Sequence, residues 1–106
     1  MSVITDIILL TFIRDSETHG GRLNAEKLSE YLCENYRSKG LVQVDGYASG
    51  NRAMQCNVFI TAVNYLDHDE FIEVFNSIKW AYPESVQLLL KCEDCDAFEI
   101  ITPLLR

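Results

Sequence analysis

Long apolar runs and alternating polar and apolar positions divide the chain into five predicted strands. Residues 3–13 are apolar except for Asp6 and two threonines. Both alternating sets of side chains in this segment are mostly apolar, which is typical of a central strand buried on both faces. Alternation at residues 41–47 and 55–65 predicts two further strands, and two shorter runs at 86–91 and 97–102 predict the last two.

Apolar residues at helical spacing predict two helices between these strands. The first is expected to start at Asn24, a good N-cap residue, and to stop at Gly40. The second is expected to start at Asp67, because Glu70 three residues later gives the spacing of a capping box. Its apolar positions continue at helical spacing as far as Tyr82, and the proline that follows ends the pattern.

The resulting order is β-α-β-β-α-β with one extra strand at the C-terminal end. This order predicts an α+β fold of the ferredoxin-like type, in which an antiparallel sheet carries two helices on one face. The first strand is expected between the third and the fourth, and the extra strand is expected to extend one edge. No linker or low-complexity tract interrupts the pattern, so we expect a single domain over residues 1–106.

Charge is unevenly distributed along the chain, and this narrows the classes of partner. The formal net charge is −7, and residues 67–106 hold nine acidic against three basic residues. Such an excess disfavours nucleic acid and favours a basic protein partner. The apolar run at 3–13 is too short to span a bilayer and has neither the charge pattern nor the flanks of a secretion signal, so we expect no membrane partner and a cytoplasmic location. The four cysteines are then expected to be reduced thiols.

Cys92 and Cys95, spaced as C-x-x-C between the last two predicted strands, are the strongest candidates for redox or metal chemistry. One such pair supplies half of a tetrahedral zinc site. Cys56 is expected at the opposite end of the sheet and Cys33 in the middle of a helix, so a four-cysteine site is disfavoured. The neighbouring acidic residues also disfavour the thiolate that redox chemistry needs. We therefore expect a polar hairpin turn and no cofactor or metal, although metal binding and a disulfide remain open.

Other polar motifs have ordinary structural explanations. His19 with the glycines at 20 and 21 precedes a helix, but their spacing matches no phosphate-binding loop. The acidic cluster that begins at Asp67 is explained by helix capping. His68 lies in that cluster, and neither histidine can be matched to a nucleophile. The sequence therefore predicts no catalytic residue, and an enzyme is the less expected class.

Two features favour protein binding. Three glutamates at helical spacing form an acidic stripe on the first helix, and Trp80 is placed opposite the apolar face of the second helix, where it would be an interface anchor. The predicted partner-binding residues are Glu26, Glu30, Glu34, Glu73, Asn76, Trp80, Glu93 and Asp94.

The resulting hypothesis is a small acidic protein-binding module, of the inhibitor, immunity-type or regulatory kind, that engages a basic partner. Two alternatives use the sheet face left free by the helices. One is a small ferredoxin-like enzyme or ligand-binding domain, with Tyr47, Asn51, Arg52 and Tyr65 as candidate ligand contacts. The other is a homodimer formed through the sheet.

Overall fold

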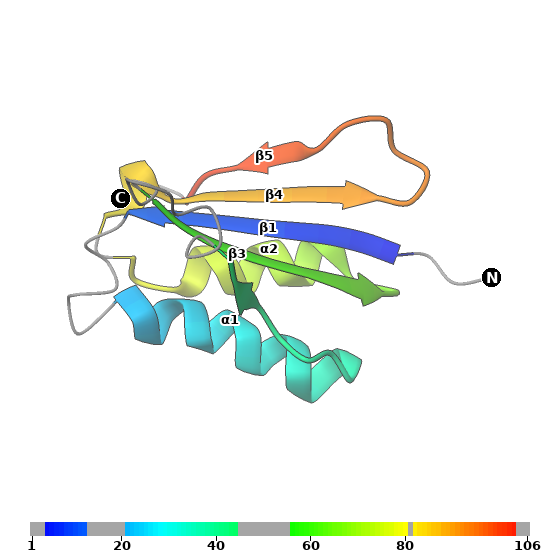
Figure 1. Ribbon diagram of the computed structural model, residues 1–106, viewed down its shortest axis with the longest axis horizontal. Helices are drawn as coiled ribbons and strands as arrows, with labels where there is room; N and C mark the ends of the chain where they lie inside the picture. The colour runs from blue at the N-terminus through cyan, green and yellow to red at the C-terminus, as the bar shows by residue number, and fades with distance from the viewer. Residues whose placement is uncertain (1–3, 13–20, 45–55, 81, 104–106) are drawn as a thin grey trace.

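The structure, a computed structural model, describes residues 4–12, 21–44, 56–80 and 82–103 and is of the α+β class. It consists of a five-stranded antiparallel sheet and two α-helices (Figure 1). In chain order the elements are β1 (Ile4–Phe12), α1 (Gly21–Tyr36), β2 (Val42–Gln43), β3 (Cys56–Asn64), α2 (His68–Ser77), the 3-10 turn η3 (Pro83–Ser85), β4 (Gln87–Cys92) and β5 (Glu99–Ile101).

β1 is the central strand of the sheet, whose order is β2-β3-β1-β4-β5. It pairs with β3 from Ile4 to Phe12 and with β4 from Thr5 to Leu10, antiparallel on both sides. The expected position of the first strand, between the third and the fourth, is confirmed. The final strand β5 pairs with β4 and extends that edge, as expected for the extra strand.

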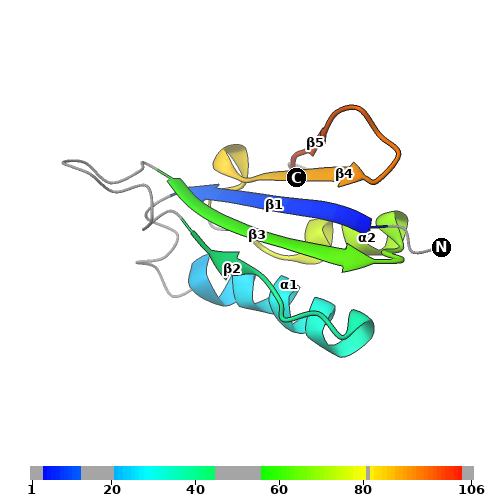
Figure 2. The same ribbon diagram turned by 45° about the vertical axis from the view of Figure 1, so that its right-hand side comes forward.

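Both helices cover the same face of the sheet, and the core lies between them and the strands. In Figures 1 and 2, α2 lies behind β1 and β3, and α1 lies near β2 at the other edge from the β4–β5 hairpin. The strand residues of the core come from alternate positions, and the same face is buried on each strand because side chains alternate along a strand. The core residues from the strands and helices are Ile7, Leu9, Val63, Leu88, Leu90, Ala25, Leu28, Leu32, Phe71 and Phe75.

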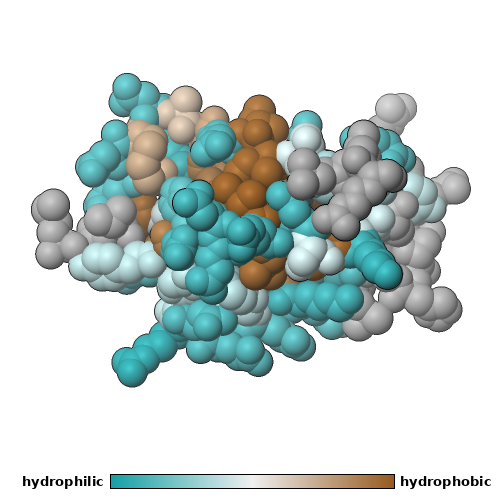
Figure 3. Space-filling view, turned by 180° about the vertical axis from the view of Figure 1, so that it is seen from behind, coloured by the Kyte–Doolittle hydropathy of each residue, from teal (hydrophilic) through white to brown (hydrophobic). Residues whose placement is uncertain are grey.

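Further apolar side chains pack against this core from its margins. They include Ile72 and Val74 on α2 and Ile78 just beyond its end, all partly buried. Seen from behind, apolar side chains gather near the middle of the surface and hydrophilic ones surround them (Figure 3).

α1 begins three residues before the expected cap, so the prediction that Asn24 caps this helix is wrong. Asn24 lies within the helix and is buried, and its Nδ2 donates a hydrogen bond of 2.9 Å to the carbonyl oxygen of Lys79. A buried amide needs such a partner. The residue therefore links the start of α1 to the segment after α2, a contact that no local pattern encodes.

The chain leaves α1 through two residues with positive φ. Arg37, immediately after the helix, has φ 54°, and Gly40 has φ 83°. A Cβ at Gly40 would meet the Oγ of Ser29 on α1, so a glycine is required there. Gly40 therefore marks the close approach of the chain to α1, and the helix itself ends at Tyr36.

α2 starts where the sequence predicts and ends sooner. Asp67 is the N-cap, and its Oδ1 accepts a hydrogen bond of 3.1 Å from the backbone N–H of Glu70. The last helical residue is Ser77, because Ile78 is extended with φ −78° and ψ 137°. The expected continuation of the helix to Tyr82 is therefore wrong, and helical spacing does not place Trp80.

Replacement of the N-cap of α2 is expected to destabilise the fold. Asp67→Ala removes the hydrogen bond to Glu70 and should lower the free energy of unfolding by about 1 kcal/mol, as measured by urea denaturation. Asp67→Asn keeps an N-cap oxygen and is expected to stay within a few tenths of the wild-type value. Equal losses for the two substitutions would show that the cap bond does not stabilise this helix.

Candidate partner-binding surface on the open face of the sheet

One face of the central strand is covered by the helices and the other is open. On β1, Thr5, Ile7 and Leu9 face the core and are at most 1% exposed. Ile4 and Ile8 point to the opposite face, where Ile4 is 37% exposed and Ile8 is half-buried. The prediction that both faces of β1 are buried is therefore wrong, because both helices lie on one side of the sheet.

Five aliphatic side chains form a continuous row across this open face, one from each strand. Their backbones are paired in register: Val42 with Ile60, Ile60 with Ile8, Ile8 with Leu89, and Leu89 with Ile100. Paired residues point to the same face of a sheet, so the row runs the full width of the sheet, about 19 Å at the usual strand spacing. We call Val42, Ile60, Ile8, Leu89 and Ile100 the apolar row.

The apolar row is most accessible at its ends and near one edge. Val42, Ile60 and Ile100 are 51%, 40% and 62% exposed, whereas Ile8 and Leu89 are half-buried. A contiguous set of exposed aliphatic side chains is unusual on the surface of a monomer and marks a site of interaction more often than isolated apolar residues do.

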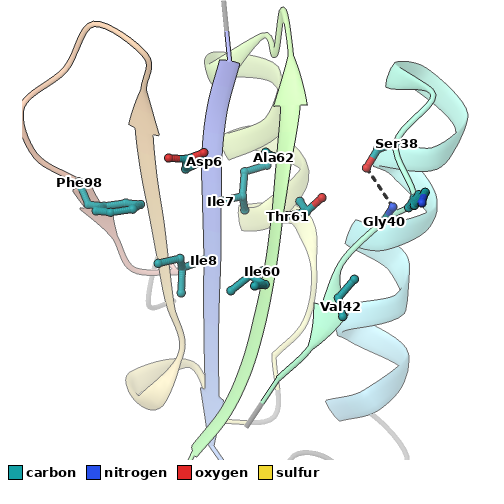
Figure 4. A pocket seen from close by; sticks show the side chains of 11 residues that line it. Asp6, Ile7, Ile8, Ser38, Gly40, Val42, Ile60, Thr61, Ala62 and Phe98 are labelled. Carbon is teal, nitrogen blue, oxygen red and sulfur yellow. Dashed lines mark hydrogen bonds between the residues drawn. The ribbon is translucent and has the colours of Figure 1, made fainter. Parts of the chain in front are cut away.

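A hollow of about 650 Å³ lies over part of the row (Figure 4). Ile8 and Ile60 line its centre, and Val42 lies on the side of β2. Phe98, which precedes β5, points towards the hollow from the opposite side, so that the connection between β4 and β5 contributes to its wall there.

The segment between α1 and β2 forms the rim of the hollow on the β2 side. Gly40 donates its backbone N–H to the Oγ of Ser38 at 2.9 Å, and the N–H of Leu41 donates to the Oγ of Ser29 at 3.1 Å. The first bond lies within the rim itself, and the second ties it to α1, which carries Ser29. The rim is therefore attached to a rigid element, as expected for a preformed site.

Charged side chains flank the apolar row on β1 and β4. Asp6 and Lys91 are paired in register on the open face, two residues along their strands from Ile8 and Leu89. Opposite charges at directly paired positions stabilise neighbouring strands. Asp6 lines the hollow, and Lys39 lies on its rim, so the hollow combines an apolar floor with charged groups of both signs.

Trp80 is not an exposed anchor, and its prediction as a partner-binding residue is corrected. It lies three residues beyond the end of α2, where helical spacing no longer applies. The indole is 7% exposed, lies 5.5 Å from the ring of Phe75, and donates its Nε1–H to the carbonyl oxygen of Phe75 at 3.1 Å. The side chain therefore completes the core at the C-terminal end of α2.

The predicted acidic residues are exposed but do not form one surface. The stripe on α1 (Glu26, Glu30 and Glu34) lies at the β2 edge, whereas Glu93 and Asp94 lie at the tip of the β4–β5 hairpin beyond the other edge (Figure 1). On α2, Glu73 is exposed and Asn76 is half-buried. The acidic hairpin leads into β5, the strand that carries Ile100 at one end of the apolar row.

The candidate ligand contacts from the sequence fall mostly outside the residues that the structure describes. Tyr47, Asn51 and Arg52 lie within residues 45–55, which the structure does not describe. His19 also lies outside the described residues. Tyr65 is described and is 63% exposed at the end of β3, with φ 58°. It does not line the hollow.

Cys92 and Cys95 form a disulfide, so the expectation of four free thiols is wrong for this pair. The predicted hairpin turn is confirmed: Cys95 donates its backbone N–H to the carbonyl oxygen of Cys92 at 3.0 Å. This turn brings the two Cα atoms to 5.2 Å, within the range that a disulfide spans. Cys33 and Cys56 are free thiols. Cys56 lies opposite Phe12 at one end of β1 and Cys92 opposite Thr5 near the other end, so the two are at opposite ends of the sheet, as expected.

A polar cluster between the helices has no counterpart in the sequence analysis. The hydroxyl of Tyr31 on α1 donates a hydrogen bond of 2.6 Å to Oε1 of Glu70 on α2, and the hydroxyl of Tyr36 accepts one of 3.1 Å from the N–H of Asp67. Burial and the bond to Glu70 both raise the pKa of Tyr31 above its ordinary value. A helical wheel places both tyrosines on the apolar face but does not show which carboxylate they meet.

His68 also makes a tertiary contact that the sequence does not reveal. Its Nε2 lies 2.9 Å from the Oγ1 of Thr5 on β1, across the start of α2. Within residues 4–12, 21–44, 56–80 and 82–103, no group of three or more histidine, cysteine or acidic side chains could hold a metal ion.

In comparisons with known proteins, no family model, curated protein or solved structure matches the chain. Neither α1 nor α2, the two α-helices of the described residues, is long and apolar enough to cross a membrane.

Truncation of Trp80 is expected to lower stability. Trp80→Ala should reduce the free energy of unfolding by about 3–5 kcal/mol, because it empties a buried site against Phe75. Trp80→Phe keeps an aromatic ring but loses the bond to the Phe75 carbonyl, and should cost about 1–2 kcal/mol. Chemical denaturation measures both values. An unchanged midpoint for Trp80→Ala would contradict the buried position.

The Tyr31–Glu70 bond is expected to make stability depend on alkaline pH. Because the folded state raises the pKa of Tyr31, its contribution is complete below the unfolded value of about 10 and is lost as pH rises above it. Urea denaturation of wild type above this pH should therefore show a decline that Tyr31→Phe lacks. Tyr65→Phe, which changes a tyrosine outside the cluster, is the matched control and should keep the wild-type decline. The same decline in all three proteins would exclude this role for Tyr31.

Proposed function

We propose that the protein is a small acidic protein-binding module, of the inhibitor, immunity-type or regulatory kind, whose open sheet face binds a basic partner in the cytoplasm. The proposed fold type is the ferredoxin-like arrangement, with β5 added beside β4, and the chain is proposed to be a single domain. Support for the fold type comes from the central position of β1, antiparallel to β3 and β4, and from the two helices on one face.

The observation that carries the proposal is that β1 has apolar side chains on both faces, although the helices cover only one of them. The strand has apolar side chains on both faces, a pattern typical of strands buried on both sides. Only one face is covered by helices, and the apolar row on the other extends over all five strands. A partner that covered this row would remove its aliphatic side chains from water, which is the main source of favourable free energy in association.

Charge favours a basic partner over a second copy of the chain. The formal net charge is −7, so two copies repel each other. The acidic residues of the hairpin, Glu93, Asp94 and Asp96, are exposed at the β5 end of the row. Together they give the usual anatomy of an interface, with an apolar centre and a charged rim. Basic side chains around an apolar patch on the partner would match both parts.

A second candidate, a small-molecule site on the same face, is favoured by the volume of the hollow. At about 650 Å³ it falls within the range of ligand pockets, and its lining is mainly aliphatic with a few polar groups. Of the candidate contacts from the sequence, Tyr65 does not line the hollow, whereas Tyr47, Asn51 and Arg52 lie outside the described residues. This candidate differs from the first because it requires no contact with the acidic side chains of Glu93, Asp94 and Asp96.

The proposal can be tested with a synthetic peptide of alternating leucine and lysine as a model partner. On titration, the methyl NMR signals of Ile8 and Ile60 should shift, and those of the core leucines Leu28 and Leu32 should not. Ile60→Ser should weaken binding about tenfold, since truncation of a central apolar contact costs 1 kcal/mol or more.

Two double variants distinguish the contribution of the hairpin acids to binding from that of the acidic stripe on α1. Glu93→Gln with Asp94→Asn should weaken binding about fivefold at low salt and little at about 0.5 M salt, because exposed charges are screened. Glu30→Gln with Glu34→Gln removes the same charge from α1 and is the matched control, with binding unchanged. Equal weakening by both pairs would exclude the hairpin as the rim. Methyl shifts that depend on protein concentration without peptide would indicate a homodimer instead.

A further inference from the structure

The connection between β4 and β5 is held by few backbone contacts. The ladder between these strands extends from the pair Leu88–Ile101 to the pair Leu90–Glu99, and residues 93–98 lie beyond it. Within this connection the Cys92–Cys95 disulfide is a covalent link, and the turn hydrogen bond between the same two residues accompanies it. The path of the connection therefore depends on a bond that a reductant can break.

Phe98 is the residue through which this connection reaches the candidate site. It follows the disulfide by three positions, is 37% exposed, and points towards the hollow on the open face (Figure 4). The other lining residues come from β1, β2, β3 and the segment after α1. Phe98 is thus the part of the hollow's wall that lies outside the strand ladder and next to the disulfide.

We propose that Cys92–Cys95 is a reversible redox site, reduced by a dithiol, and that its reduction displaces Phe98 and opens the hollow on the β5 side. In the proposed cytoplasmic location structural disulfides are rare, and those that form there are usually transient and catalytic or redox-sensing. The consequence for partner binding rests on the proposed function, whereas the movement of Phe98 does not.

The chemistry is a thiol–disulfide exchange that balances in two steps. A thiolate of the dithiol attacks Sγ of Cys95, the more exposed of the two, and the Cys92 sulfur leaves and takes up a proton. The second thiol of the reductant, after losing its proton, then displaces the sulfur of Cys95, which is protonated in turn. Two electrons and two protons pass to the protein, and the reductant becomes a disulfide.

The surrounding charge selects the kind of reductant. Glu93, Asp94 and Asp96 are exposed beside the disulfide, and Lys91 is the nearest basic residue along the chain. The local excess of negative charge repels an anionic thiol such as glutathione and favours a neutral or cationic one. Two monothiols serve as probes of this charge effect, with two molecules consumed for each disulfide: cysteamine should reduce the site faster than glutathione at low salt, and the difference should shrink as salt screens the acids.

The test uses the full chain with Cys33→Ser and Cys56→Ser, so that only the Cys92–Cys95 pair can respond. Methyl NMR spectra are recorded before and after treatment with dithiothreitol, and alkylation followed by mass measurement confirms that two thiols have formed. The methyl signals of Ile8 should move towards their positions in Phe98→Ala. Cys92→Ser with Cys95→Ser should give the same shift without reductant.

Each outcome decides the proposal. Full reduction that leaves the Ile8 signals unchanged, while Phe98→Ala moves them, would show that the disulfide does not hold Phe98. Collapse of the Leu28 and Leu32 signals on reduction would show a structural disulfide and no local switch. If the Ile8 signals move but the leucine–lysine peptide binds neither form, the redox switch stands and the proposed function fails.

Discussion

The structure depends on the burial of β1 at the centre of the sheet. Its core-facing side chains Ile7 and Leu9 are almost fully buried, and they are paired with β3 on one side and with Leu88 and Leu90 of β4 on the other. Hydrophobic burial of this kind is the dominant favourable contribution to folding. The two helices, the order of the strands and the position of the core all follow from covering this face.

Polar contacts then set how the helices lie against one another and against the segments that flank them. Tyr31 bonds to Glu70, and Asn24 bonds to the carbonyl of Lys79, so that α1 is joined both to α2 and to the segment that follows it. Trp80 fills the space left where α2 ends early, with its indole N–H bound to the Phe75 carbonyl. The first two contacts join residues 39 and 55 positions apart in the chain, whereas the Trp80 bond is local, and all three lie on the helix-covered side of the sheet.

The open side joins two features that are separate in the sequence. The apolar row runs across all five strands, and the acidic, disulfide-closed hairpin joins β4 and β5, the two strands that carry Leu89 and Ile100 of the row. Phe98 connects the two, because it follows the hairpin turn and lines the hollow over the row. Under the proposed function, the apolar row would meet the apolar patch of a basic partner, and under the proposed redox switch, reduction of the disulfide would control access to it.

The sequence by itself determined the order of the elements, the α2 cap at Asp67 and the division of β3 into two faces, because each follows from periodicity or from a contact within a few residues. Only the tertiary structure decided that Trp80 is buried, that Asn24 bonds to another segment, that β1 has an open face and that Cys92 is bonded to Cys95. The physical reason is that helical spacing places a side chain only while the helix continues. Beyond Ser77, as at the sheet's open face, burial depends on which elements are packed together in space.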